Sequence, residues 1–207
     1  MTIIKKYCNF FIIAAAFCIL FSDAFAQMKD DDLLKYGETQ IILGKYKSAS
    51  DTVLALVKKP SLQFHYLMGV CFEKQEKWQD AIDHFQKATV IDPNNERSMI
   101  ALSYMGLGRA MMASGQYEQA IESFTIVTTT YYSDLDPDYP RYPNYLDNAN
   151  QKIHNIADDA QFRIAECYER LGETEKARKA YAKVNRFYPF SAVLSEANDK
   201  LASLLNQ

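Results

Sequence analysis

Four copies of one ten-residue pattern run through this chain. They are "GKYKSASDTV" at Gly44–Val53, "EKWQDAIDHF" at Glu76–Phe85, "GQYEQAIESF" at Gly115–Phe124 and "GETEKARKAY" at Gly172–Tyr181. Each copy opens on Gly or a polar residue and has an aromatic residue or Thr two places on, Ala five places on and a bulky residue nine places on. Recurrence of this kind is typical of repeat architectures, in which each unit buries its apolar face against the next. The pattern therefore predicts a stack of similar units.

The second copy has the most complete register. In "YLMGVCFEKQEKWQDAIDHFQKATVIDPNN" the positions 8, 11, 20, 24, 27 and 32 are Gly69, Phe72, Ala81, Phe85, Ala88 and Pro93. This register resembles the tetratricopeptide repeat, a helix-turn-helix unit of about 34 residues. The resemblance implies an all-α fold, a right-handed α-solenoid of about four such repeats with a C-terminal capping helix. Small residues at positions 8 and 20 allow two helices to cross closely, and the Gly near position 15 suits a helix C-cap.

The repeats are expected at residues 30–61, 62–95, 101–134 and 158–191 of a solenoid domain that spans 27–207. Five extra residues, "ERSMI", should lengthen the first helix of the third repeat to Glu96–Ser114. Three prolines exclude a helix from a Tyr/Pro-rich insert at 133–145, after which a long helix should start near Leu146. Residues 191–206 fit a capping helix, with Ser191 as its N-cap.

The N-terminal segment has the features of a secretory signal peptide. Lys5 and Lys6 precede an apolar run at 10–21, and Ala24-Phe25-Ala26 is a small-x-small cleavage pattern. The run is shorter than the roughly 20 residues that a membrane span needs. We therefore expect a signal peptide at 1–26 and an exported protein, periplasmic or secreted, with no membrane insertion after cleavage. A retained anchor helix remains the alternative, and bulky Phe17 argues against a lipid anchor at Cys18.

Charge and motifs exclude several classes of function. Without Lys5, Lys6 and Asp23 the net charge of −3 becomes −4, so the chain lacks the basic footprint of a nucleic-acid-binding protein. None of its histidines has a zinc-site spacing, and no phosphate-binding loop or nucleophile elbow is present. Cys71 and Cys167 share one repeat position, which favours two separate buried thiols over a disulfide. We expect no catalytic residues, no metal, no cofactor and no enzyme.

The resemblance places a binding site on the first helix of each repeat, helix A. Positions 2, 5, 9, 12 and 13 of helix A line a concave groove in this family. Carried over by position, the partner-binding groove comprises Glu38, Tyr66, Lys74, Arg109, Phe162, Glu166 and Arg170. The tips of Tyr66, Arg109, Phe162 and Arg170 are expected to face solvent, where aromatic and Arg side chains often dominate binding energy.

The repeats and the signal peptide together are similar to exported bacterial envelope scaffolds, such as outer-membrane assembly lipoproteins and the Tol-Pal coordinator. We expect a scaffold or adaptor of the cell envelope that holds a peptide or a partner helix in its groove. A self-associating structural component, with the capping helix or the insert as the homo-oligomer contact, is the alternative. The sequence does not name the protein partner.

Overall fold

The computed structural model describes residues 28–91, 97–130, 156–189 and 191–206, and over these ranges the chain is helical with no strand. The chain divides into two compact units, Met1–Lys59 and Pro60–Gln207. The expected signal peptide at 1–26 and the Tyr/Pro-rich insert at 133–145 lie outside the described residues. Within the described ranges, no helix combines the length and the apolar character that crossing a membrane requires.

The N-terminal unit begins with α2, Asp30–Ile42, which is followed by a short α3 at Tyr46–Ser48. The chain then forms a π-helical segment, η1, at Ala49–Val53 and a 3-10 turn, η2, at Leu54–Leu56. The second helix of the first repeat is therefore irregular, although the ten-residue pattern predicts a regular one.

The π-helical segment explains which residue enters the core of the first unit. A π turn holds one residue more than an α turn, so the next buried position moves along the chain. Leu54 is fully buried and lies against Gly37 of α2, whereas Leu56 is 37% exposed. The unit ends where the Asp30 carboxylate accepts hydrogen bonds from the backbone N–H groups of Lys58 and Lys59, at 3.0 and 2.9 Å.

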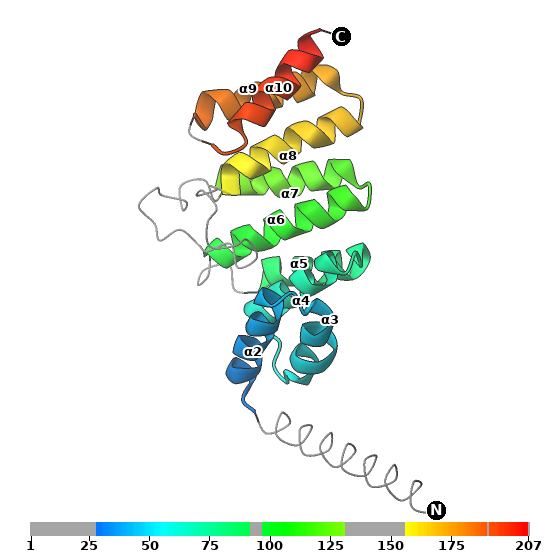
Figure 1. Ribbon diagram of the computed structural model, residues 1–207, viewed down its shortest axis with the longest axis vertical. Coiled ribbons are helices and arrows are strands. Elements are labelled where there is room, and N and C mark those ends of the chain that lie inside the picture. Colours follow the sequence, from blue (N-terminus) through cyan, green and yellow to red (C-terminus); the bar gives the residue numbers. More distant parts are fainter. Residues whose placement is uncertain (1–27, 92–96, 131–155, 190, 207) are drawn as a thin grey trace, which may run out of the picture. The chain divides into compact units, whose positions relative to one another are not determined.

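The C-terminal unit contains three helix pairs and a last helix. They are α4 (Leu62–Lys74) with α5 (Trp78–Val90), α6 (Arg97–Ala113) with α7 (Tyr117–Thr130), α8 (Ile156–Arg170) with α9 (Thr174–Phe187), and α10 (Leu194–Leu205). Each helix packs against the next in chain order, and Figure 1 shows α4 to α10 in this order. The all-α repeat fold is thus confirmed. With 17 residues α6 is longer than the 13-residue α4, as the five extra residues predict, although it is shorter than the expected Glu96–Ser114.

Small residues sit where the helices of a pair cross, as the register predicts. Ala81, Ala120 and Ala177 are fully buried. Gly69 of α4 lies so close to Phe85 of α5 that a Cβ at this glycine would come within 2.7 Å of the ring. Close approach of the backbone therefore allows each large side chain at position 24 to fill the space between two helices.

The turns between paired helices use a left-handed residue. Gly44, Gly115 and Gly172 have φ values of 71°, 83° and 72°, the conformation expected of a helix C-cap glycine. In the second repeat the same place is taken by Glu76, whose φ is 59°. This conformation costs a residue with a Cβ roughly 1–2 kcal/mol.

The capping helix α10 starts later than predicted. Its first residue is Leu194 and its N-cap is Val193, while Ser191 precedes the helix and its Oγ accepts a hydrogen bond from Val193 N–H at 3.1 Å. Ser191 therefore orders the approach to the helix and does not cap it. Lys200 Nζ lies 3.2 Å from Glu169 Oε2, which ties the capping helix to α8.

Candidate binding groove

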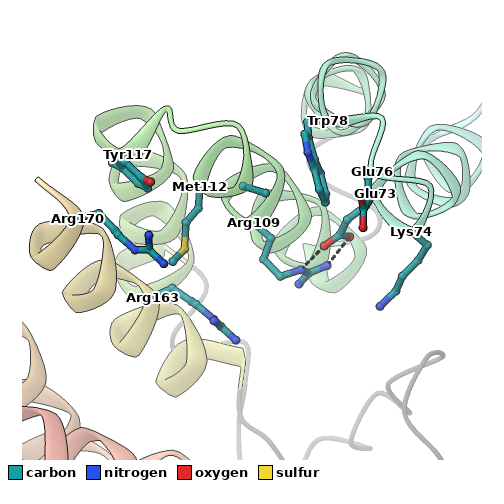
Figure 2. Close-up of a pocket in the computed structure, with 10 residues that line it drawn as sticks. Glu73, Lys74, Glu76, Trp78, Arg109, Met112, Tyr117, Arg163 and Arg170 are labelled. Carbon is teal, nitrogen blue, oxygen red and sulfur yellow. Dashed lines mark hydrogen bonds and ion pairs between the residues drawn. The ribbon is translucent and has the colours of Figure 1, made fainter.

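A pocket of about 550 Å³ lies along the helix A side of the C-terminal unit. The residues that line it come from the later turns of α4 and α6, from the middle and the end of α8, from the α4–α5 turn and from the first residues of α5 and α7. They are Glu73, Lys74, Glu76, Trp78, Arg109, Met112, Ala113, Tyr117, Arg163 and Arg170. Figure 2 shows these side chains gathered from three consecutive repeats. We call this surface the groove.

One bidentate ion pair spans two repeats at the groove. Arg109 of α6 donates from Nε to Glu73 Oε1 at 2.7 Å and from Nη2 to Glu73 Oε2 at 3.0 Å, drawn as dashed lines in Figure 2. Burial opposes the charge on Arg109, but the Glu73 carboxylate outweighs this effect and keeps the pKa of the guanidinium above its ordinary value. The two side chains are 34% and 12% exposed, so the pair is fixed rather than free in solvent.

A second cation is balanced by carboxylates of its own helix. Arg163 of α8 donates to Asp159 at 3.3 Å and to Glu166 at 2.9 Å. Burial raises the pKa of the Glu166 carboxyl, and the Arg163 guanidinium partly opposes that rise. Glu166 therefore orients Arg163 at the groove without lining the groove itself.

Lys74 and Arg170 are the exposed cations of the groove. Each lies in the last turn of a helix A, where the negative end of the helix dipole favours a positive charge. Within the described ranges, the structure records an ion pair for neither of them. Across the whole lining, four cations face two carboxylates, in a chain whose net charge is −3. The groove is thus positive on a protein that is acidic as a whole.

Apolar and aromatic side chains supply the other four of the ten lining residues. Trp78 and Tyr117 are the first residues of α5 and α7, and Met112 lies near the end of α6. Both aromatic residues are half-buried, so each offers ring surface to a ligand. Sequence reasoning by helix A positions missed them, yet they are the aromatic residues of the ten-residue pattern.

The residues that repeat positions assign to the groove take different places in the structure. Lys74, Arg109 and Arg170 line the pocket, whereas Glu166 acts through Arg163. Glu38 lies on α2 of the N-terminal unit, and the groove is formed by the other unit. Whether these residues bind a partner stays a prediction.

The expectation that Tyr66 and Phe162 face solvent is wrong. Phe162 is 2% exposed and packs edge-on against Tyr181 of α9, with ring centroids 5.4 Å apart. Tyr66 is 9% exposed and its ring centroid lies 6.2 Å from that of Phe85. Both residues occupy position 5 of helix A. A large ring at this position turns towards helix B, because burial between the helices removes more apolar surface from water.

Metal binding and thiol reactivity would depend on the His, Cys, Asp and Glu side chains of the described residues. Among them, no group of three His, Cys, Asp or Glu side chains is placed to hold a metal ion. Cys71 and Cys167 are both fully buried and are not joined by a disulfide. Burial raises the pKa of the Cys167 thiol to about 12, which leaves it without nucleophilic thiolate at neutral pH.

Comparisons with known proteins agree with this fold. Two models of the tetratricopeptide repeat match residues 63–95 and 159–191. The chain is 24% identical to the "Low calcium response locus protein H" of Yersinia pestis over 170 residues. The aligned residues make up 81% of this chain and 84% of that protein. The protein of the same name from Yersinia pseudotuberculosis matches to the same extent.

A solved structure shows the same arrangement of helices. It contains nearly identical TPR-like repeats of a kinesin light chain from Podosopora anserina. The TM-score is 0.61 at 15% sequence identity, over 85% of this chain and 84% of that one. At this identity the likeness supports the repeat fold alone.

Proposed function

Because the chain is a tetratricopeptide-repeat protein, we propose that it is an adaptor that holds an acidic peptide or partner helix in the groove. The repeats support a protein–protein interaction scaffold. The chemistry of the partner and the place where it binds are our proposal. The partner carries carboxylates that meet Lys74 and Arg170, and an apolar side chain that packs beside Trp78 and Tyr117.

The observation that carries this proposal is the arrangement of charge in the groove. The carboxylate of Glu73 is already satisfied by Arg109, and Arg163 is held by Asp159 and Glu166. Lys74 and Arg170 therefore contribute positive potential at the two sides of the groove, on α4 and on α8. Complementary charge steers the encounter and sets the register of a partner, while buried aromatic contacts supply more of the affinity.

The site of action is a further part of the proposal. Lys5, Lys6, the short apolar run and the Ala-x-Ala pattern support export to the periplasm or the medium, in an envelope assembly. The intact mass of the protein recovered from the envelope or medium should correspond to a chain that begins at Gln27. Recovery of the chain with Met1 from membranes would contradict export with cleavage.

Reversing the charge of the exposed groove cations tests the proposal. The double variant Lys74→Glu with Arg170→Glu should lose a partner that the wild type retains in a pull-down from its own cells. Its circular dichroism should stay unchanged, because both side chains are exposed and surface substitutions usually shift stability by no more than about 0.5 kcal/mol. The matched control is Lys179→Glu with Lys183→Glu, which reverses two exposed cations on α9, away from the groove lining. An equal loss in the control would reject the groove.

Self-association is the second candidate function. Phe187, near the end of α9, is 51% exposed, and Leu205, at the end of α10, is 58% exposed. Exposed apolar side chains on the last helices of a repeat array can pack against a second copy. Sedimentation over a hundredfold range of concentration separates the two functions. The groove proposal expects a monomer throughout, and self-association expects a dimer that dissociates on dilution.

A further inference from the structure

Two histidines that are 19 residues apart in the sequence meet between α4 and α5. His65 lies in the first turn of α4 and His84 near the middle of α5. Their Nδ1 atoms are 3.1 Å apart, their ring centroids are separated by 5.2 Å, and the rings are inclined at 44°. Neither residue lines the groove, so this pair is a separate feature of the second repeat.

Aromatic neighbours hold the two rings in place. Phe64 packs edge-on against His65 at 5.1 Å between centroids, and Phe72 lies 5.4 Å from His84. Both histidines are partly exposed, so water reaches the pair. Burial lowers the pKa of both imidazoles, and that of His84 falls to about 4. A positive charge on His65 would lower the pKa of His84 as well. Both rings are therefore neutral at neutral pH, as metal-binding imidazoles must be.

We propose that His65 and His84 form a two-histidine site for a divalent transition metal ion such as Cu²⁺, Ni²⁺ or Zn²⁺. The separation of the two nitrogens carries this inference. Two donors 3.1 Å apart, each about 2.05 Å from one ion, subtend an angle of about 98° at the metal. This angle lies between the right angle of a square-planar site and the tetrahedral angle. The packed rings already place the two donor atoms at the required separation.

The pair exists without metal as a hydrogen bond between the two Nδ1 atoms. One ring then carries its proton on Nδ1 and donates it to the other. When a metal ion binds, that ring changes tautomer and its proton moves to Nε2, so both Nδ1 lone pairs point to the ion. No net proton is released at neutral pH. Small rotations about the side-chain bonds complete the change.

The charges around the pair allow a cation. Asp83 and Asp80 both stabilise positive charge at His84, and Lys87 opposes them. The Asp83 carboxylate and Lys87 form an ion pair at 2.7 Å, so much of the lysine charge is already balanced. Since no third protein ligand is assembled among the described residues, water fills the remaining positions. Imidazole with water suits Cu²⁺, Ni²⁺ and Zn²⁺ and disfavours Ca²⁺ and Mg²⁺.

The test uses the full chain, produced without a histidine tag and stripped of metal with a chelator. Isothermal titration with CuCl₂, NiCl₂ and ZnCl₂ at pH 7.5 should show one saturable site, tightest for Cu²⁺. His65→Gln and His84→Gln should each weaken binding at least tenfold. His154→Gln is the matched control, since it removes the third histidine, and it should retain wild-type affinity.

A spectroscopic readout on the unaltered protein guards against a variant that fails to fold. Electron paramagnetic resonance of the Cu²⁺ complex should show coupling to two imidazole nitrogens. Absence of a saturable site in the wild type would overturn the proposal. Equal affinity in His84→Gln, or loss of binding in His154→Gln, would overturn it as well.

Discussion

Replacing Gly108 by Ala tests the close approach on which the helix pairs depend. Gly108 lies on α6 at repeat position 8, facing Phe124 of α7. A Cβ at this position would lie 2.5 Å from Phe124 Cε1 and 2.7 Å from both Cδ1 and Cζ. Carbon atoms pack at about 3.5–4.0 Å, and Phe124 is fully buried, so its ring cannot turn into solvent.

The expected destabilisation follows from two opposing effects. Overpacking of a filled core costs roughly 1–3 kcal/mol. Because three contacts would be shorter than 3 Å, we expect a cost near the upper limit, about 3 kcal/mol. Alanine is intrinsically better than glycine inside a helix by about 1 kcal/mol. The net loss should therefore be about 2 kcal/mol. For a chain of this size the melting temperature should fall by roughly 4–8 °C.

Thermal and urea unfolding of Gly108→Ala, Phe124→Leu and the double variant measure this effect. Phe124→Leu alone should cost about 1–2 kcal/mol through the space it leaves. In the double variant the smaller side chain makes room for the new methyl group, so the loss should be less than the sum by about 1 kcal/mol or more. Strictly additive losses, or a Gly108→Ala variant as stable as the wild type, would refute the reasoning.

Three further predictions rest on single residues. Glu76→Gly should stabilise the fold by about 1 kcal/mol in urea unfolding, because Glu76 holds a φ of 59° that glycine adopts freely; a loss of stability would contradict it. Phe162→Ala should destabilise the chain by about 3–5 kcal/mol, since its ring is 2% exposed, and an unchanged melting point would show that it belongs to the surface. In EDTA, the free energy of unfolding should fall by about 1 kcal/mol as the pH drops from about 6.5 to about 4, the lowered pKa of His84. Over this range the unfolded chain binds a proton that the folded chain does not bind. His84→Gln should reduce that loss, with the lowered pKa of His65 accounting for the remainder, and an equal loss in the variant would assign it elsewhere.

The sequence predicted those parts of the fold that local chemistry controls. Glycines at Gly115 and Gly172 marked the helix ends because few other residues accept a positive φ. Buried alanines at helix crossings followed from the repeat register, since any larger side chain would separate the helices. The irregular η1 segment was not predictable from the pattern, because a π turn depends on how Leu54 fits against Gly37.

The candidate site was predicted less completely because it depends on contacts between repeats. Glu73 and Arg109 are 36 residues apart, and their pairing follows from the packing of α4 against α6. Repeat position alone also assigned Phe162 to the groove, although its size decides that it packs inward. A metal site at His65 and His84 was not expected, because their spacing along the chain matches no zinc motif. Spacing along the chain does not show which residues of two facing helices are neighbours.

Site-specific photo-crosslinking tests the central claim, that a partner binds in the groove. A photoreactive phenylalanine at Ala113, an exposed lining residue, should crosslink in cells to a partner carrying an acidic segment. The same group at Gln119, exposed on α7 and outside the lining, should give little product. Adding Lys74→Glu and Arg170→Glu should abolish the Ala113 product. A product from Gln119 but not from Ala113, or a product that is a second copy of this chain, would contradict the account.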